Sequence, residues 1–242
     1  MIVAHVSDLH LTGSNFVEKW GENLIKILNS IKPDIVVITG DITDDGYIHE
    51  YEIAKEFLER IDAKKLVVPG NHDARNKGYE IFEEIFGTRY PLYENNEIVI
   101  LGIDSSEPDI DDGHIGRENY SMIKEKMATD KIKILALHHH LIPIPGTGRE
   151  RNIPIDAGDV LNLCMKLQIN FVLSGHKHLP WKWKLENIYL ITAGTACSRR
   201  LKGRSYPSFN LFKIEDEEIS LKEINVCDGS EKEILNHKLT IP

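Results

Sequence analysis

The feature that most constrains the fold of this chain is a series of short runs rich in Ile and Val, many of them followed directly by polar residues. Amphipathic segments with the period of a helix separate many of these runs. Alternation of this kind indicates crossover connections between parallel strands, and therefore an α/β fold. The strand-like runs cover residues 2–7, 34–40, 65–70, 97–103, 131–137, 170–175 and 188–194, and the helical segments cover residues 15–31, 47–61, 117–128 and 157–168.

The last quarter of the chain has a different pattern. Residues 208–226 contain two strand-like runs around an acidic turn, which predicts an antiparallel hairpin. We therefore expect a four-layer αββα sandwich, in which two mixed β-sheets pack face to face with helices outside, and the hairpin belongs to the second sheet. The chain has 242 residues, 41% of them apolar, and no linker or repeat, so we predict a single domain over residues 1–242.

Charge and cysteine content exclude several classes of protein. The formal net charge of -9 argues against a protein that binds phosphates through a basic face, so no stable nucleic-acid complex is expected. Three widely spaced cysteines without a CxxC pair indicate neither a disulfide framework nor a thiolate zinc site. The first residues lack a basic signal region, and no apolar run reaches the ~20 residues of a membrane span. These patterns predict a cytoplasmic protein without a membrane partner, and they are compatible with a homodimer.

Candidate ligands for metal ions follow five of the strand-like runs. In open α/β sheets the carboxyl ends of the strands meet at one crevice, so residues far apart in sequence are expected to share one site there. Members of a pair separated by one residue on an extended segment would point to the same side. The polar residues after the five runs are Asp8 and His10, then Asp41, then Asn71, His72 and Asp73, then His138, His139 and His140, and finally His176 and His178.

The donor types indicate which ions such a site would hold. Carboxylate, imidazole and amide oxygen without thiolate suit Mn, Fe, Zn, Ni or Co. Seven ligands from this set would exceed what one ion needs, whereas two ions that share a carboxylate would use all seven. Two-metal sites of this type serve in-line displacement at phosphorus. Asp41, which ends a central strand, is the predicted bridge, so we expect a dinuclear metal site at the strand carboxyl ends.

Five short motifs together resemble the calcineurin-like metallophosphoesterase family, in particular its compact phosphodiesterase-like branch. They are "SDLH" at 7–10, "GD" at 40–41, "GNHD" at 70–73, "HH" at 138–139 and "GHKH" at 175–178. The resemblance implies that His72 binds no metal and either contacts the phosphate or protonates the leaving oxygen. It also implies two groups of metal ligands, the first Asp8, His10, Asp41 and His178, and the second Asp41, Asn71, His138 and His176.

Some assignments near these motifs have alternatives. His139 is the rival of His138 as ligand; on an extended backbone it would point away from its neighbour, which favours a supporting or substrate-facing role. Asp73 is predicted to act in catalysis by orienting His72 or a neighbouring ligand, because such imidazoles need a partner for the second ring nitrogen. His5 is interpreted as a packed core residue, and residues 109–112 as a solvated loop.

Two basic loops, residues 144–152 and 198–204, follow strands whose carboxyl ends face the same crevice. Their guanidinium groups suit phosphate oxygens. We therefore predict that Arg149 or Arg151, together with Arg199 or Arg200, binds substrate outside the metals. The alternative is that both loops are solvated surface.

The predicted function is hydrolysis of a small-molecule phosphate ester by water or hydroxide that bridges two metal ions. A phosphodiesterase, with cyclic nucleotides among its candidate substrates, is the first choice, and a phosphomonoesterase is the alternative. DNA-repair nucleases share the motifs but carry an additional capping domain, for which this acidic chain has no room. A non-catalytic scaffold is the remaining rival; loss of ligands would mark such a protein, and none is lost here.

Overall fold

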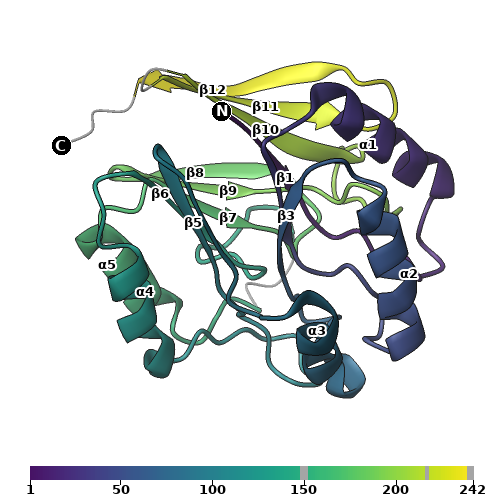
Figure 1. The fold of residues 1–242 in the computed structure, drawn as a ribbon, viewed down its shortest axis with the longest axis horizontal. Coiled ribbons are helices and arrows are strands. Elements are labelled where there is room, and N and C mark those ends of the chain that lie inside the picture. The colour runs from purple at the N-terminus through teal and green to yellow at the C-terminus, as the bar shows by residue number, and fades with distance from the viewer. Residues whose placement is uncertain (148–151, 216–217, 239–242) are drawn as a thin grey trace.

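The sandwich consists of two six-stranded sheets with helices on both outer faces, as the computed structural model of residues 1–147, 152–215 and 218–238 shows (Figure 1). The first sheet has the order β12 (Glu231–Lys238), β11 (Glu218–Asn225), β10 (Ser208–Glu215), β1 (Ile2–Val6), β2 (Ile35–Thr39) and β3 (Lys64–Val68). The second sheet has the order β4 (Leu92–Glu94), β5 (Ile98–Gly102), β6 (Ile132–Ala136), β7 (Phe171–Ser174), β9 (Ile188–Thr192) and β8 (Trp181–Leu185).

Buried apolar side chains form three cores between the four layers. Successive residues of a strand point to opposite faces, so Ala4 and Val6 of β1 pack under the first layer of helices, whereas Val3 packs between the sheets. The first layer contains α1 (Glu18–Ile31), α2 (Ile48–Glu59) and α3 (Gly78–Phe86), and the second layer contains α4 (Tyr120–Lys126) and α5 (Ala157–Lys166). The two mixed sheets with helices outside confirm the predicted α/β sandwich.

The strands and helices expected from hydrophobic periodicity are present. Each predicted strand-like run contains a strand, and α1, α2, α4 and α5 lie within the predicted helical segments, α4 being preceded by the 3-10 turn η2 (Arg117–Asn119). The sequence reading missed α3, β4, β8 and β12. β4, β8 and β12 are largely exposed, so their hydrophobic pattern is weak; β8, for example, is an edge strand with three exposed residues in a row, whereas α3 is amphipathic but short.

The C-terminal hairpin is an antiparallel pair, as predicted, but its sheet is not the one expected. Strand β10 pairs antiparallel with β1, so the last three strands extend the sheet that begins with β1. The placement in the second sheet was wrong. β1 pairs with β2 along one edge only, and β10 supplies the hydrogen-bonding partner along the other edge.

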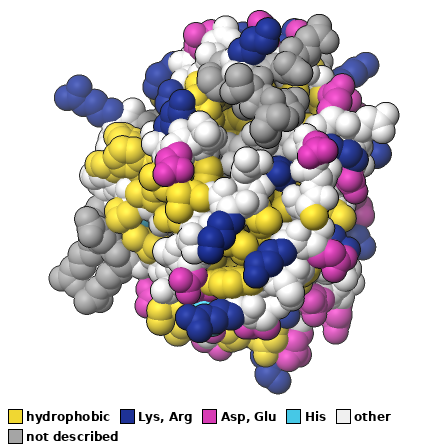
Figure 2. Space-filling model, turned by 90° about the vertical axis from the view of Figure 1, so that its left-hand side faces the viewer, with side chains coloured by type: hydrophobic (Ala, Val, Ile, Leu, Met, Phe, Trp, Pro, Cys, Tyr) yellow, Lys and Arg dark blue, Asp and Glu magenta, His cyan; other side chains and the backbone are white. Residues whose placement is uncertain are grey.

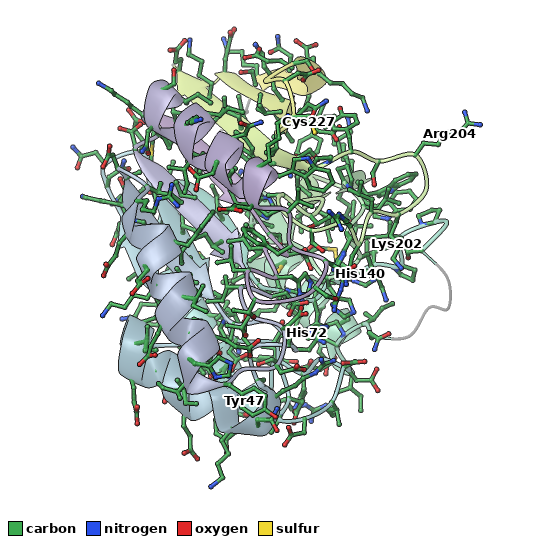
Figure 3. All side chains as sticks on the ribbon, turned by 90° about the vertical axis from the view of Figure 1, so that its right-hand side faces the viewer. Tyr47, His72, His140, Lys202, Arg204 and Cys227 are labelled. Atoms are coloured by element: carbon green, nitrogen blue, oxygen red, sulfur yellow. The ribbon has the colours of Figure 1, made fainter. Side chains whose placement is uncertain are left out.

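Strand direction determines where the site lies. β1, β2 and β3 are parallel to one another, and so are β5, β6, β7 and β9. Loops that leave both sheets therefore meet at one end of the sandwich, where Figure 3 shows His72 and His140.

Charged side chains of both signs lie on the surface of the molecule. On the face shown in Figure 2, basic and acidic side chains are interspersed with apolar ones and form no continuous basic surface. Within the described ranges, no helix has the length and apolar character required to cross a bilayer.

Candidate metal centre

The backbone turns sharply at the residues that form the site. Five of the predicted ligands have left-handed backbone angles, a conformation that costs a residue with a side chain about 1–2 kcal/mol. The expected extended pairs were therefore wrong, because each strand ends before its ligands and the side chains converge through a turn instead. The five φ values are 53° for Asp8, 45° for His10, 52° for Asp41, 70° for His176 and 54° for His178.

The first ligand group forms where the loops after β1, β2 and β7 meet. Asp8, His10, Asp41 and His178 are all buried, and each offers a ligand atom within 4.8 Å of the others. His178 Nε2 lies 3.2 Å from Asp8 Oδ1 and 3.2 Å from His10 Nε2. These four are the residues that the family resemblance implied for one ion.

The second group lies beside the first and shares Asp41 with it. Asn71 Oδ1 is 3.1 Å from His138 Nε2 and 3.0 Å from His176 Nδ1, and these two nitrogens are 3.2 Å apart. Asp41 Oδ2 lies 3.4 Å from His138 Nε2 and 3.7 Å from His10 Nε2. The structure thus brings the seven predicted ligands together, with one carboxylate oxygen between the two groups.

Hydrogen bonds to the outer ring nitrogens define the tautomers of three histidines. His138 Nδ1 donates to the Thr39 carbonyl at 2.7 Å, and His178 Nδ1 donates to the Arg200 carbonyl at 2.9 Å. A carbonyl can only accept, so the proton of each neutral ring is on Nδ1 and the lone pair is on Nε2. His10 Nδ1 faces Asp44 Oδ1 at 2.7 Å, which favours the same tautomer.

These tautomers make the cluster suitable for metal ions. The Nε2 lone pairs of His10 and His178 face each other at 3.2 Å, an arrangement that is repulsive unless a proton or a cation lies between them. Imidazole rings held through their other nitrogen by a carboxylate or a carbonyl are the usual arrangement of histidine ligands. The donor set therefore fits a metal cluster, and its nitrogen and oxygen atoms suit the transition ions expected from the sequence.

The charges of the buried groups are strongly coupled. Burial alone would raise the pKa of Asp41, but the neighbouring His138 and His72 hold it well below its usual range. Burial alone would lower the pKa of His138, yet Asp41 and Asp8 raise it to about 9. An ion that binds His138 must displace this proton, so binding is expected to release protons at neutral pH.

The structure separates the roles of the adjacent histidines that the sequence left as rivals. His139 is fully buried; its Nδ1 lies 2.9 Å from Ser105 Oγ, and its Nε2 donates a hydrogen bond of 3.1 Å to the Asp111 carbonyl. Neither ring nitrogen faces the cluster, whereas Nε2 of His138 does. The geometry favours His138 as ligand, and it contradicts a substrate-facing role for His139.

The two residues predicted to be catalytic are placed differently. His72 lines the cavity beside the cluster; its Nδ1 donates to the Asp44 carbonyl at 2.6 Å, and its Nε2 is 3.3 Å from Arg200 Nη1. Asp73 accepts hydrogen bonds from Gly70 N at 2.8 Å and from Thr43 N at 2.9 Å.

Asp73 therefore ties the loop after β2 to the loop after β3. Among the described residues, no hydrogen bond joins it to the His72 ring, so of the two predicted roles the contacts favour support of a neighbouring ligand. Its backbone partners flank Asp41 and Asn71, so its carboxylate supports the positions of two ligands.

A cavity of about 370 Å³ adjoins the cluster, and basic residues line part of it. Of the four predicted substrate-binding arginines, Arg200 lines this cavity, with Nη2 3.4 Å from Asp44 Oδ1. Arg199 is exposed and is not part of the lining. Arg149 and Arg151 lie outside the described residues.

Two acidic residues of the site were missed from the sequence. Asp44 holds the outer nitrogen of His10, and its only signal was its position three residues after Asp41. Asp111 was interpreted as part of a solvated loop, yet it lines the cavity and accepts a hydrogen bond from Asn71 Nδ2 at 3.0 Å. The two partners are 40 positions apart, so no local pattern could indicate their contact.

Comparisons with known proteins agree with this geometry. The chain is 27% identical over 214 residues to a probable cyclic nucleotide phosphodiesterase of Xenorhabdus bovienii, covering 81% of this chain and 84% of that protein. It is 29% identical over 218 residues to a probable glycerophosphodiester phosphodiesterase of Arcobacter nitrofigilis, covering 81% and 78%. The structure of a purple acid phosphatase from yellow lupin seeds shares the fold with a TM-score of 0.77 at 14% identity, over 96% of this chain and 52% of that one. The family model for calcineurin-like phosphoesterases matches residues 1–180, so the chain belongs to the calcineurin-like phosphoesterase family.

Proposed function

We propose that this protein is a metal-dependent phosphodiesterase that acts on a small-molecule phosphate ester. The observation that carries the proposal is the position of Asp41 Oδ2, which faces His10 in one ligand group and His138 in the other, beside an open cavity. Two relatives named as phosphodiesterases, one for cyclic nucleotides and one for glycerophosphodiesters, support diesters as the substrate class.

Metal ions bound by the two ligand groups would supply Lewis acidity and an activated water for in-line displacement at phosphorus. Asp8, His10 and His178 would hold one ion, Asn71, His138 and His176 the other, and Asp41 would contact both. The choice among Mn, Fe, Zn, Ni and Co is left to experiment, because imidazole and carboxylate donors accept each of them.

In this proposal, Arg200 would bind the phosphate group. Its guanidinium lies on the cavity wall between His72 and Asp44, and its planar donors suit two phosphoryl oxygens. The backbone carbonyl of the same residue receives the Nδ1 proton of His178, which fixes this part of the loop next to the ligand group.

In this proposal, His72 would protonate the leaving oxygen. Its Nδ1 proton is bound by the Asp44 carbonyl, so Nε2 is the ring atom that faces Arg200 and the cavity. When Arg200 binds the phosphate, Nε2 becomes available to hold a proton and deliver it to the departing alkoxide.

The proposal is tested with chelator-treated protein to which Mn²⁺ is restored. We expect metal-dependent hydrolysis of bis(p-nitrophenyl) phosphate, with 3′,5′-cyclic AMP and a glycerophosphodiester as further substrates, and slower hydrolysis of p-nitrophenyl phosphate. Asp41→Asn should lower both bound metal and turnover. Undiminished activity after metal removal would refute the metal-dependent mechanism, and preference for the monoester would transfer the function to a phosphomonoesterase. A homodimer, a cytoplasmic location and a single domain over residues 1–242 stay predictions.

A further inference from the structure

Asp111 contacts the metal centre from a loop that no family motif includes. The loop runs from β5 to η2, and Asp111 Oδ1 accepts hydrogen bonds from Asn71 Nδ2 at 3.0 Å and from Arg75 Nη2 at 2.9 Å. The backbone carbonyl of Asp111 accepts a hydrogen bond from His139 Nε2 at 3.1 Å. Asp111 is thus held at two points, through its side chain at the predicted ligand Asn71 and through its backbone at the buried His139, which lies in the loop after β6.

The chemistry of an amide makes this contact informative. A primary amide has nearly the same shape when its oxygen and nitrogen exchange places, but only the oxygen can bind a cation. A carboxylate accepts hydrogen bonds and donates none, so Asp111 can bind only the NH₂ end of Asn71. With that end held, Oδ1 of Asn71 points at His138 Nε2 and His176 Nδ1, at 3.1 and 3.0 Å.

Arg75 keeps the carboxylate in place on its exposed side. The Asp111 side chain is 57% exposed and that of Arg75 is 27% exposed, so their ion pair adds little to stability. Arg75 Nη1 also reaches the Asp44 carbonyl at 3.2 Å, the same oxygen that receives the His72 proton. Loss of the Asp111 carboxylate should therefore leave the fold intact while it frees the Asn71 amide.

We propose that Asp111 is a positioning residue that holds the Asn71 amide oxygen toward the second metal group and thereby sets the affinity of that group for its ion. The inference rests on the proposed metal centre. It assigns a function to a residue of the loop that the sequence indicated as plain solvated surface.

The test is a calorimetric titration of chelator-treated protein with Mn²⁺, carried out in the absence of substrate. Unaltered protein is expected to bind two ions. Asp111→Ala should weaken one of them by about 10–100-fold, the range for loss of a group that orients a ligand, and leave the other unchanged. Asp111→Asn should weaken it less, because its amide oxygen can still accept the Asn71 hydrogen bond. Asp112→Ala is the matched control, since Asp112 is the exposed neighbouring acid and does not line the cavity.

A double-mutant cycle separates orientation of Asn71 from a general charge effect. In an Asn71→Ala background there is no amide to orient, so Asp111→Ala should cause no further loss of affinity. An equal loss in both backgrounds, or an equal loss in Asp112→Ala, would overturn the inference. If unaltered protein fails to bind two ions, the proposed metal centre is refuted; if it binds two and Asp111→Ala does so equally well, only the role of Asp111 is refuted. Thermal unfolding of each variant is measured alongside, and a midpoint close to that of the unaltered protein is expected.

Discussion

Gly70→Ala is expected to damage both metal groups through one added methyl. An ideal Cβ at Gly70 would overlap Asp41 Oδ1 and would lie 2.5 Å from the Asp41 backbone nitrogen and 2.9 Å from its Cγ. Contacts between non-bonded carbon atoms are most favourable at about 3.5–4.0 Å, so the loop after β2 must retreat by about 1 Å. Overpacking of this kind costs about 1–3 kcal/mol, which corresponds to roughly 2–12 °C in the unfolding midpoint of a chain of this size.

The functional loss should exceed the loss of stability, because Asp41 faces both ligand groups. A misplacement of about 1 Å in a catalytic constellation lowers turnover by about 100-fold. We would measure the unfolding midpoint, Mn²⁺ affinity and hydrolysis of bis(p-nitrophenyl) phosphate. Gly158→Ala is the control, because a Cβ there meets nothing within 4 Å and alanine favours the helix. Unchanged metal affinity and turnover in Gly70→Ala would refute the assignment of Asp41 as the shared ligand.

Two further predictions concern the phosphate contact and the buried histidines. Arg200→Ala should raise KM for the best diester several-fold with unchanged metal content, because it removes a phosphate contact but keeps the backbone carbonyl that holds His178. Arg199→Ala, outside the cavity lining, should leave KM unchanged. Equal effects of the two substitutions on KM would argue against a specific contact. Burial lowers the pKa of His5 from 6.5 to about 3, so only the unfolded chain binds this proton between those pH values, and the free energy of unfolding should fall with decreasing pH. In chelator-treated protein, His5→Gln should reduce the change of unfolding free energy with pH between pH 5 and 6 by about 1.4 kcal/mol per pH unit. The measurement is denaturant titration at each pH, and an unchanged pH dependence would contradict the lowered pKa of His5.

The sequence by itself determined the fold class and the loops that carry the candidate metal ligands. Hydrophobic periodicity is a local property, so nine of the strands and four of the helices could be located from neighbouring residues alone. Polar ligands directly after apolar strands indicated the site, because the carboxyl ends of parallel strands meet in one place. The same reasoning predicted that polar residues from five loops share one site, and the family resemblance selected seven of them as ligands.

Only the tertiary structure decided how those residues face one another. The left-handed turns at Asp8 and His176 follow from close packing of two loops, which no alternation of residue types records. The choice between His138 and His139 depends on which ring nitrogens find partners, and those partners, the Thr39 carbonyl in β2 and Ser105 Oγ in the loop after β5, are distant in sequence. The contact of Asp111 with Asn71 likewise joins distant loops. Such contacts arise from packing in three dimensions, and a hydrogen bond between remote side chains leaves no period or motif in the chain.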